Sequence, residues 1–150
     1  MSKISILVQF AKNDTTNSYK EINFSSVPNF QAKIILEETG IDVKGCIKYL
    51  TASGIRHVLN SHADEHLEAY NNQIAVTDEE FEIIPIVLSS PDFYEVGNNN
   101  RRRNKAILFK KIINNKIYHV IMSIVNKSGE NILMFNTMYI KKADEINHQP

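Results

Sequence analysis

The fold is decided by residues 105–142, which read KAILFKKIINNKIYHVIMSIVNKSGENILMFNTMYIKK. Three segments rich in β-branched and aromatic side chains, at 105–113, 116–125 and 131–142, are separated by clusters of Asn, Ser and Gly. This pattern predicts three strands joined by tight turns, because Asn and Gly tolerate the positive φ that short hairpin loops need. We therefore expect an antiparallel meander in the C-terminal third of the chain.

The lengths of the two hairpin loops predict which residues lie opposite one another. If the Asn pair at 114–115 is a two-residue loop, Lys110 lies opposite His119. If residues 127–129 form a three-residue loop, His119 lies opposite Thr137. Because side chains alternate between the two faces of a strand, Lys110, His119 and Thr137 are expected to form one row across the meander.

This predicted row is chemically unusual, because it combines an ammonium, an imidazole and a hydroxyl with the phenol of Tyr139 two residues along on the same face. These groups could hold a phosphate and move protons. The same residue types are also ordinary on the solvated outer face of a sheet. The opposite face is expected to form the core, with Ile107, Phe109, Tyr118, Val120, Met122, Ile124, Met134, Met138 and Ile140.

The first forty residues predict two short strands and a helix. Apolar side chains at alternate positions of Lys3–Phe10 favour a strand, and residues 19–24 favour a second one. A helix is expected to begin near Pro28, which suits a first turn, and to end before Gly40, which suits a left-handed cap.

The middle of the chain predicts further helices. Residues 51–53 offer a cap for a helix over 54–62, which either continues or restarts over 64–70. Thr77 and Glu80 have the spacing of a capping box, and the helix that follows is bent or shortened by Pro85. The whole chain is thus expected to be one α+β domain over 1–150, with N-terminal helices packed on a C-terminal antiparallel meander.

Composition excludes several classes of protein. With 150 residues, 43% hydrophobic and 23% charged, the chain resembles an ordinary globular domain. The single cysteine, Cys46, rules out an internal disulfide framework and a cysteine-rich zinc module. No apolar run is long enough to span a membrane, and no secretory signal is apparent. We therefore expect an intracellular protein.

The 17 basic and 17 acidic side chains are segregated along the chain. Residues 57–96 contain nine acidic residues and no Lys or Arg, whereas residues 97–142 contain ten basic residues and one acidic residue. The basic half could present a positive surface to a polyanion, or the two halves could neutralise each other across the fold. Arg101, Arg102 and Arg103 in a polar loop, with Lys105 beside it, are the candidates for such a contact.

Three histidines, His57, His62 and His66, fall in or near one predicted helix. His62 and His66 are four residues apart, a spacing that zinc sites use, but the metalloprotease pattern needs Glu directly after the first His, and Ala63 stands there. The sequence also lacks a serine elbow, a phosphate loop and a dinucleotide glycine pattern. We expect neither a metal ion nor a cofactor.

Several short segments occur along the chain in a specific order. They are TGIDVKG at 39–45, GIRH at 54–57 with His62 five residues later, IAVTDEEFEIIP at 74–85 leading to SPD at 90–92, ILFK at 107–110, and FNTMY at 135–139. In this order they resemble the phage-associated nucleases of the Barnase–EndoU–colicin–RelE superfamily. The resemblance covers residues 39–142, and residues 1–32 are expected to add an extra N-terminal strand and loop.

The resemblance implies a metal-independent, toxin-like ribonuclease of phage or mobile-element origin, which cleaves RNA by attack of the ribose 2′-hydroxyl on the adjacent phosphate. It implies helices packed on an antiparallel sheet whose exposed face carries the site. The motif positions of the family map onto His57, His62, Lys110, Thr137 and Tyr139. His119, which the family does not require, is added by the predicted register as a residue that lines the site.

The chemistry of RNA cleavage suggests a role for each of these residues. His57 is the first choice for general acid or base and His62 the second, because imidazole titrates near neutrality. Lys110 is expected to stabilise developing charge, Thr137 to donate to a phosphate oxygen, and Tyr139 to position the ribose or the phosphate. RNA, with tRNA as one candidate, is the expected partner, together with an immunity protein or antitoxin. Arg101, Arg102, Arg103 and Lys105 are the candidate RNA-binding residues, for the phosphates that flank the site. The resemblance also implies the cytoplasm of a bacterial host cell, with carriage in a phage particle as a further option.

Two departures from the family pattern leave other functions open. Ala63 stands where members commonly have Gly, and Asn71 and Asn72 precede Gln73 where members often have Arg-Gly. These changes favour a non-catalytic RNA- or protein-binding module on a degenerate nuclease fold. A phage accessory protein whose acidic 64–82 surface mimics nucleic acid, and a zinc-dependent hydrolase, are the remaining alternatives.

Overall fold

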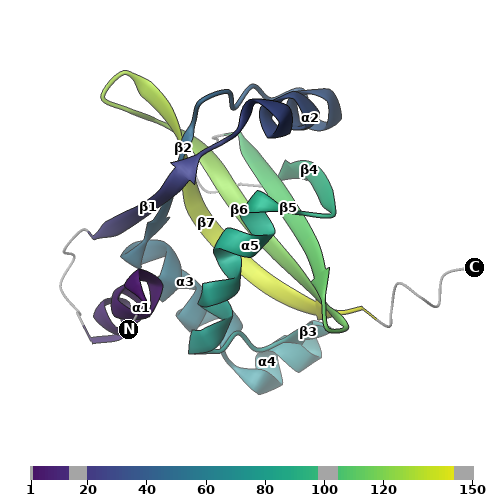
Figure 1. Ribbon diagram of the computed structural model, residues 1–150. Coiled ribbons are helices and arrows are strands. Elements are labelled where there is room, and N and C mark those ends of the chain that lie inside the picture. Colours follow the sequence, from purple (N-terminus) through teal and green to yellow (C-terminus); the bar gives the residue numbers. More distant parts are fainter. Residues whose placement is uncertain (1, 14–19, 98–104, 144–150) are drawn as a thin grey trace, which may run out of the picture.

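The computed structural model describes residues 2–13, 20–97 and 105–143, which form one mixed sheet with helices (Figure 1). The helices are α1 (Lys3–Asn13), α2 (Asn29–Thr39), α3 (Ala52–His62), α4 (Glu65–Tyr70), the 3₁₀ helix η1 (Asp78–Ile83) and α5 (Ile84–Ser89). The strands are β1 (Glu21–Ser26), β2 (Ile47–Thr51), β3 (Gln73–Ile74), β4 (Phe93–Gly97), β5 (Ala106–Ile113), β6 (Lys116–Lys127) and β7 (Glu130–Lys142).

The sheet has the strand order β1-β2-β7-β6-β5-β4, and the short β3 pairs with the end of β7. The meander from β4 to β7 is antiparallel, whereas β2 runs parallel to β7, so the sheet as a whole is mixed. Figure 1 shows α5 lying across one face of the meander, with α1 and α3 at its side. The expected α+β class is confirmed, and the sheet is larger than the predicted three-stranded meander, to which β1, β2, β3 and β4 are added.

The first hairpin has the predicted loop. Asn114 and Asn115 have φ values of 50° and 63°, as a type I′ turn requires, and Ile113 pairs with Lys116. Lys110 consequently lies opposite His119, as predicted. The predicted core face is also buried under the helices, with Ile107, Val120, Met122, Met138 and Ile140 fully inaccessible.

The register of the second hairpin was predicted wrongly. Its loop contains two residues, Ser128 and Gly129, both with positive φ, and not three. The register then shifts between Ile121 and Met122, where Asn136 is the extra residue of a β-bulge. His119 therefore lies opposite Tyr139 instead of Thr137.

The bulge decides which side chains of β7 reach the core. Before it, Leu133 and Phe135 are buried in the core, so Met134, which was predicted to be a core residue, is on the other face and only half-buried. Without the extra residue, the alternation would carry Thr137 and Tyr139 into the core. With it, Met138 and Ile140 pack in the core, and Thr137 and Tyr139 share a face with His119.

The N-terminal segment forms a helix, α1, so the predicted strand over Lys3–Phe10 is wrong. Ile4, Leu7, Val8 and Ala11 are buried, and their spacing is that of one helical face. The apolar residues also fit alternation because Ile6 lies between Ile4 and Val8, but Ile6 is 47% exposed. Both periods fit so short a segment, and packing against α3 and η1 selects the helix.

The helix boundaries largely follow the predicted signals. α2 ends at Gly40, whose φ of 75° is the expected left-handed cap, and the Thr51 hydroxyl accepts a hydrogen bond from the Gly54 N–H at the start of α3. Asp64 caps a separate helix, α4. The Thr77 side chain makes no capping hydrogen bond, and a 3₁₀ turn precedes α5, which has Pro85 in its first turn.

Helix α3 packs unusually close to β7, and this contact positions the site. β2 pairs with Leu133 and Met134 of β7, β3 pairs with Ile140 and Lys141, and α3 packs against β7 between them. A Cβ on Gly54 would lie 2.6 Å from the Phe135 ring and 3.1 Å from its carbonyl oxygen. Only glycine allows this approach, which brings the C-terminal half of α3 toward the second half of β7. None of the helices in the described ranges is long and apolar enough to cross a bilayer.

Candidate active site

A row of side chains crosses four strands on the sheet face opposite the main core. Phe93 lies opposite Lys110, Lys110 opposite His119, and His119 opposite Tyr139. Directly opposed residues of antiparallel strands share a face and are close neighbours. The structure thus brings Lys110, His119 and Tyr139 together and extends the row to Phe93, which the sequence analysis did not single out.

His119 is the buried centre of this row. Its ring stacks on Tyr139 with centroids 4.4 Å apart and an interplanar angle of 13°, and its Nδ1 lies 3.2 Å from the Ile117 carbonyl. Burial, together with the charges of Lys110 and Lys141, lowers the pKa of His119 to about 4, although backbone hydrogen bonds act in the opposite direction. The imidazole is therefore neutral near pH 7, and its Nδ1 carries the hydrogen because a carbonyl can only accept.

Tyr139 connects the row to helix α3. Its ring centroid lies 6.1 Å from that of His62, and Lys141 Nζ lies 5.8 Å from the ring centroid. Burial raises the pKa of the Tyr139 phenol, and the negative charge of Glu95 raises it further. The phenol consequently stays protonated at neutral pH and is available as a hydrogen-bond donor.

Lys110 has an acidic partner that sequence reasoning missed. Its Nζ lies 2.8 Å from Oε1 of Glu95 on the neighbouring strand β4. The Lys110 side chain is 24% exposed and that of Glu95 is 52% exposed, so solvent reaches the pair and screens it. An incoming phosphate could therefore take the place of the carboxylate beside the ammonium.

His62 is held by a second carboxylate that the sequence analysis also missed. His62 Nδ1 lies 3.2 Å from Oε2 of Glu68, which is 1% exposed on α4. Asp64 fixes the start of α4 by accepting from the N–H groups of His66 and Leu67, and the His62 carbonyl accepts from Val76. A buried carboxylate that accepts from Nδ1 orients the ring and leaves Nε2 for proton transfer.

The remaining predicted residues lie around this centre. The His57 ring stands edge-on to His62, with centroids 6.2 Å apart, and His57 is half-buried. Thr137 lies opposite Ile121, and its Oγ1 is buried with no hydrogen-bond partner among the described residues. An unpaired buried hydroxyl costs about 1–3 kcal/mol, which a bound ligand could recover.

The basic loop cannot be placed in the same way. Arg101, Arg102 and Arg103 lie outside the described residues. Lys105 is exposed directly before β5, where its carbonyl accepts from the Ile124 N–H. The described residues also contain no group of three or more His, Cys, Asp or Glu side chains placed to hold a metal ion.

The arrangement combines two kinds of chemical group at one place. Two imidazoles, one of them oriented by a buried carboxylate, can act as proton acceptor and proton donor. An ammonium, a protonated phenol and a hydroxyl can stabilise negative charge beside them. Proton transfer together with anion stabilisation is what displacement at a phosphodiester requires.

Comparison with known proteins agrees with this chemistry. Residues 25–148 match the family described as phage-Barnase-EndoU-ColicinE5/D-RelE like nuclease3, and no curated protein or solved structure gives a significant match. The matched range covers most of the chain and includes every predicted site residue. The chain therefore belongs to the phage-associated Barnase–EndoU–colicin–RelE-like nuclease family.

Proposed function

We propose that the protein is an endoribonuclease that cleaves RNA by in-line attack of a ribose 2′-hydroxyl on the adjacent phosphate, without a metal ion. The observation that supports this most is the carboxylate-oriented imidazole of His62 beside the Tyr139 and Lys110 row. Membership of a nuclease family gives a nucleic acid as the substrate. Attack by a 2′-hydroxyl is open only to RNA.

The general base in this proposal is His62. Glu68 accepts from Nδ1 of His62, so Nε2 presents a lone pair that can take the 2′-hydroxyl proton, and the buried carboxylate stabilises the imidazolium that forms. His57, the first choice from the sequence, becomes the second imidazole: it starts the step as an imidazolium and gives its own proton to the leaving 5′-oxygen. His119 is unsuited to either step, because its pKa of about 4 keeps it neutral and it is buried.

The negative charge on the pentacoordinate phosphorane is stabilised by groups from β5 and β7. Lys110 exchanges Glu95 for a non-bridging phosphate oxygen, and the Tyr139 phenol and Thr137 hydroxyl donate hydrogen bonds. Removing one such donor typically reduces kcat by about 10²- to 10³-fold. We also propose that Arg101, Arg102, Arg103 and Lys105 bind flanking phosphates.

The biological setting belongs to the same proposal. A ribonuclease of this kind would act as a toxin in the cytoplasm of a bacterial host, with tRNA as one candidate substrate. Such an activity calls for an immunity protein or antitoxin in the cell that makes it.

The test is cleavage of tRNA and of total RNA in EDTA by the purified protein and by its His62→Ala, Lys110→Ala and Glu68→Gln variants. We expect products that end in 2′,3′-cyclic phosphate, and losses of about 10²-fold or more in the first two variants. His66→Ala, at an exposed position on the same helix as Glu68, is the matched control and should retain full activity. Cleavage of an oligonucleotide with a 2′-deoxyribose at the scissile position would contradict the mechanism, as would full activity of both alanine variants.

Non-catalytic RNA binding is the second candidate function, and one observation favours it. The Lys110 ammonium already has the Glu95 carboxylate as its partner, so it has a counter-charge without a reacting phosphate. In this case RNA binding would weaken with salt and no cleavage product would form.

A further inference from the structure

A groove runs along the outer edge of the sheet, next to the proposed active site. β4 is the terminal strand of the sheet, and the groove between β4 and α2 has a volume of about 740 Å³. Its apolar walls come from Phe30 and Ile34 of α2 and from Phe93 of β4, and Glu38 and Glu95 also line it. The proposed chemistry uses none of the three apolar side chains.

We propose that this groove binds the nucleobase next to the scissile phosphate, stacked on the ring of Phe93. The proposal rests on the proposed ribonuclease function and adds a subsite to it. The ligand is the base of a flanking nucleotide in single-stranded RNA.

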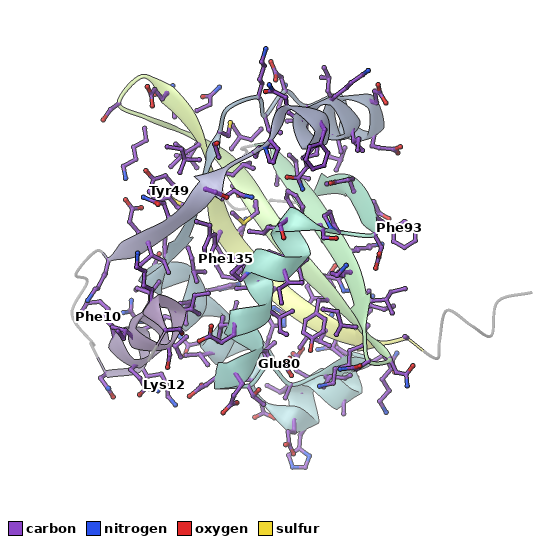
Figure 2. All side chains as sticks on the ribbon, in the orientation of Figure 1. Phe10, Lys12, Tyr49, Glu80, Phe93 and Phe135 are labelled. Carbon is purple, nitrogen blue, oxygen red and sulfur yellow. The ribbon has the colours of Figure 1, made fainter. Side chains whose placement is uncertain are left out.

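The position of Phe93 supports this assignment. Phe93 lies directly opposite Lys110, and neighbouring strands are about 4.8 Å apart, so its backbone is one strand beyond the lysine that holds the phosphate. Its side chain is 55% exposed, and Figure 2 shows the ring projecting from the edge of the sheet. A nucleotide whose phosphate contacts Lys110 can therefore place a neighbouring base over this ring.

The charges in the groove favour a base over a phosphate. Glu38 and Glu95 line the groove, and Asp92, also in its lining, accepts from the Ile112 N–H. Carboxylates repel a phosphate, whereas a nucleobase is uncharged and carries N–H groups that donate to them. An exposed aromatic ring beside such acceptors matches the stacking platforms on which proteins hold single-stranded bases.

The experiment uses a short oligoribonucleotide that the wild-type protein cleaves, and the same oligonucleotide made non-cleavable by a 2′-O-methyl group at the scissile position. A 2-aminopurine at the flanking position reports stacking through its fluorescence. We expect Phe93→Ala to raise the Kd for the non-cleavable oligonucleotide and the KM for cleavage by about 5- to 100-fold, with kcat little changed. Phe93→Trp should restore binding and quenching, and Tyr70→Ala, which removes an 88% exposed aromatic ring outside the groove, should have no effect.

The possible failures are distinguishable. If the wild-type protein cleaves RNA but Phe93→Ala binds the oligonucleotide as well as wild type does, the subsite is overturned and the ribonuclease proposal stands. Equal defects in Phe93→Ala and Phe93→Trp would also overturn stacking. If the wild-type protein neither binds nor cleaves RNA, both proposals fall.

Discussion

Replacing His119 with glutamine should remove a loss of stability that the wild-type protein suffers in mild acid. The pKa of His119 is about 4 in the folded protein, against an ordinary value of 6.5 that applies to the unfolded chain. Because the folded pKa is the lower one, the unfolded state binds the proton more readily. The part of the unfolding free energy that depends on a neutral His119 is therefore fully present above pH 6.5 and is lost as the pH falls toward 4.

The size of this loss follows from the difference between the two pKa values. One pKa unit corresponds to about 1.4 kcal/mol, so protonation of His119 costs about 3 kcal/mol of unfolding free energy by pH 4. The cause is burial of the ring, which is 5% exposed, together with the positive charges of Lys110 and Lys141. Glutamine is uncharged, and its amide can still donate to the Ile117 carbonyl.

The assay is urea unfolding followed by far-ultraviolet circular dichroism between pH 7.5 and pH 4. Carboxylates also titrate in this range, but they do so in both proteins and cancel in the difference. We expect the His119→Gln variant to lose about 3 kcal/mol less than wild type across this range. His66→Gln, at an exposed position, should behave like wild type. Parallel losses in wild type and His119→Gln would refute the buried, neutral imidazole.

Three further changes test the electrostatics and packing around the site. Glu95→Gln should lower the pKa of Tyr139, because it removes a negative charge that disfavours the phenolate. The titration of Tyr139 alone is the difference between ultraviolet titrations with and without Tyr139→Phe, and it is compared between proteins with and without Glu95→Gln. Thr51→Ala should cost about 1 kcal/mol of unfolding free energy, because it removes the hydrogen bond that caps α3, and urea midpoints with an unchanged m-value would check this. Gly54→Ala should cost about 1–3 kcal/mol of unfolding free energy, because the added Cβ would lie 2.6 Å from the Phe135 ring and 3.1 Å from the Phe135 carbonyl oxygen, which is backbone and cannot rotate away. Unchanged stability in thermal unfolding would show that α3 can move away from β7.

The meander was predictable because its signals are local. A pair of Asn residues at positive φ fixes the first hairpin, and alternation then sets the faces. The second hairpin shows the limit of this reasoning. A two-residue loop and the extra residue Asn136 together displace the predicted partner of His119 by two positions, from Thr137 to Tyr139. A shift of two preserves the face, so the predicted face is correct although the predicted pairing is not.

The two carboxylates of the site were missed because tertiary structure creates their contacts. Glu68 follows His62 by six residues, which is not a contact spacing within one helix, and the pair forms only because the chain turns between α3 and α4. Glu95 reaches Lys110 across the β4–β5 pairing, and β4 was not predicted as a strand. The sequence thus indicated the candidate side chains and gave no sign of the carboxylates that pair with them.

These partners bear on whether the nuclease fold is degenerate here. The two departures from the family pattern preserve the backbone: Ala63 has φ −103° and ψ −6°, which any residue adopts, and Asn72 has φ 59°, a left-handed conformation that Asn tolerates nearly as well as Gly. What this loop loses is the charge of the arginine that members often carry where Asn71 stands. The Glu68 carboxylate, which the loop does not disturb, still holds His62. In the proposed mechanism catalysis therefore depends more on Glu68 than on the altered loop: Glu68→Gln should lower kcat for RNA cleavage, whereas Asn71→Arg should change only the affinity for RNA.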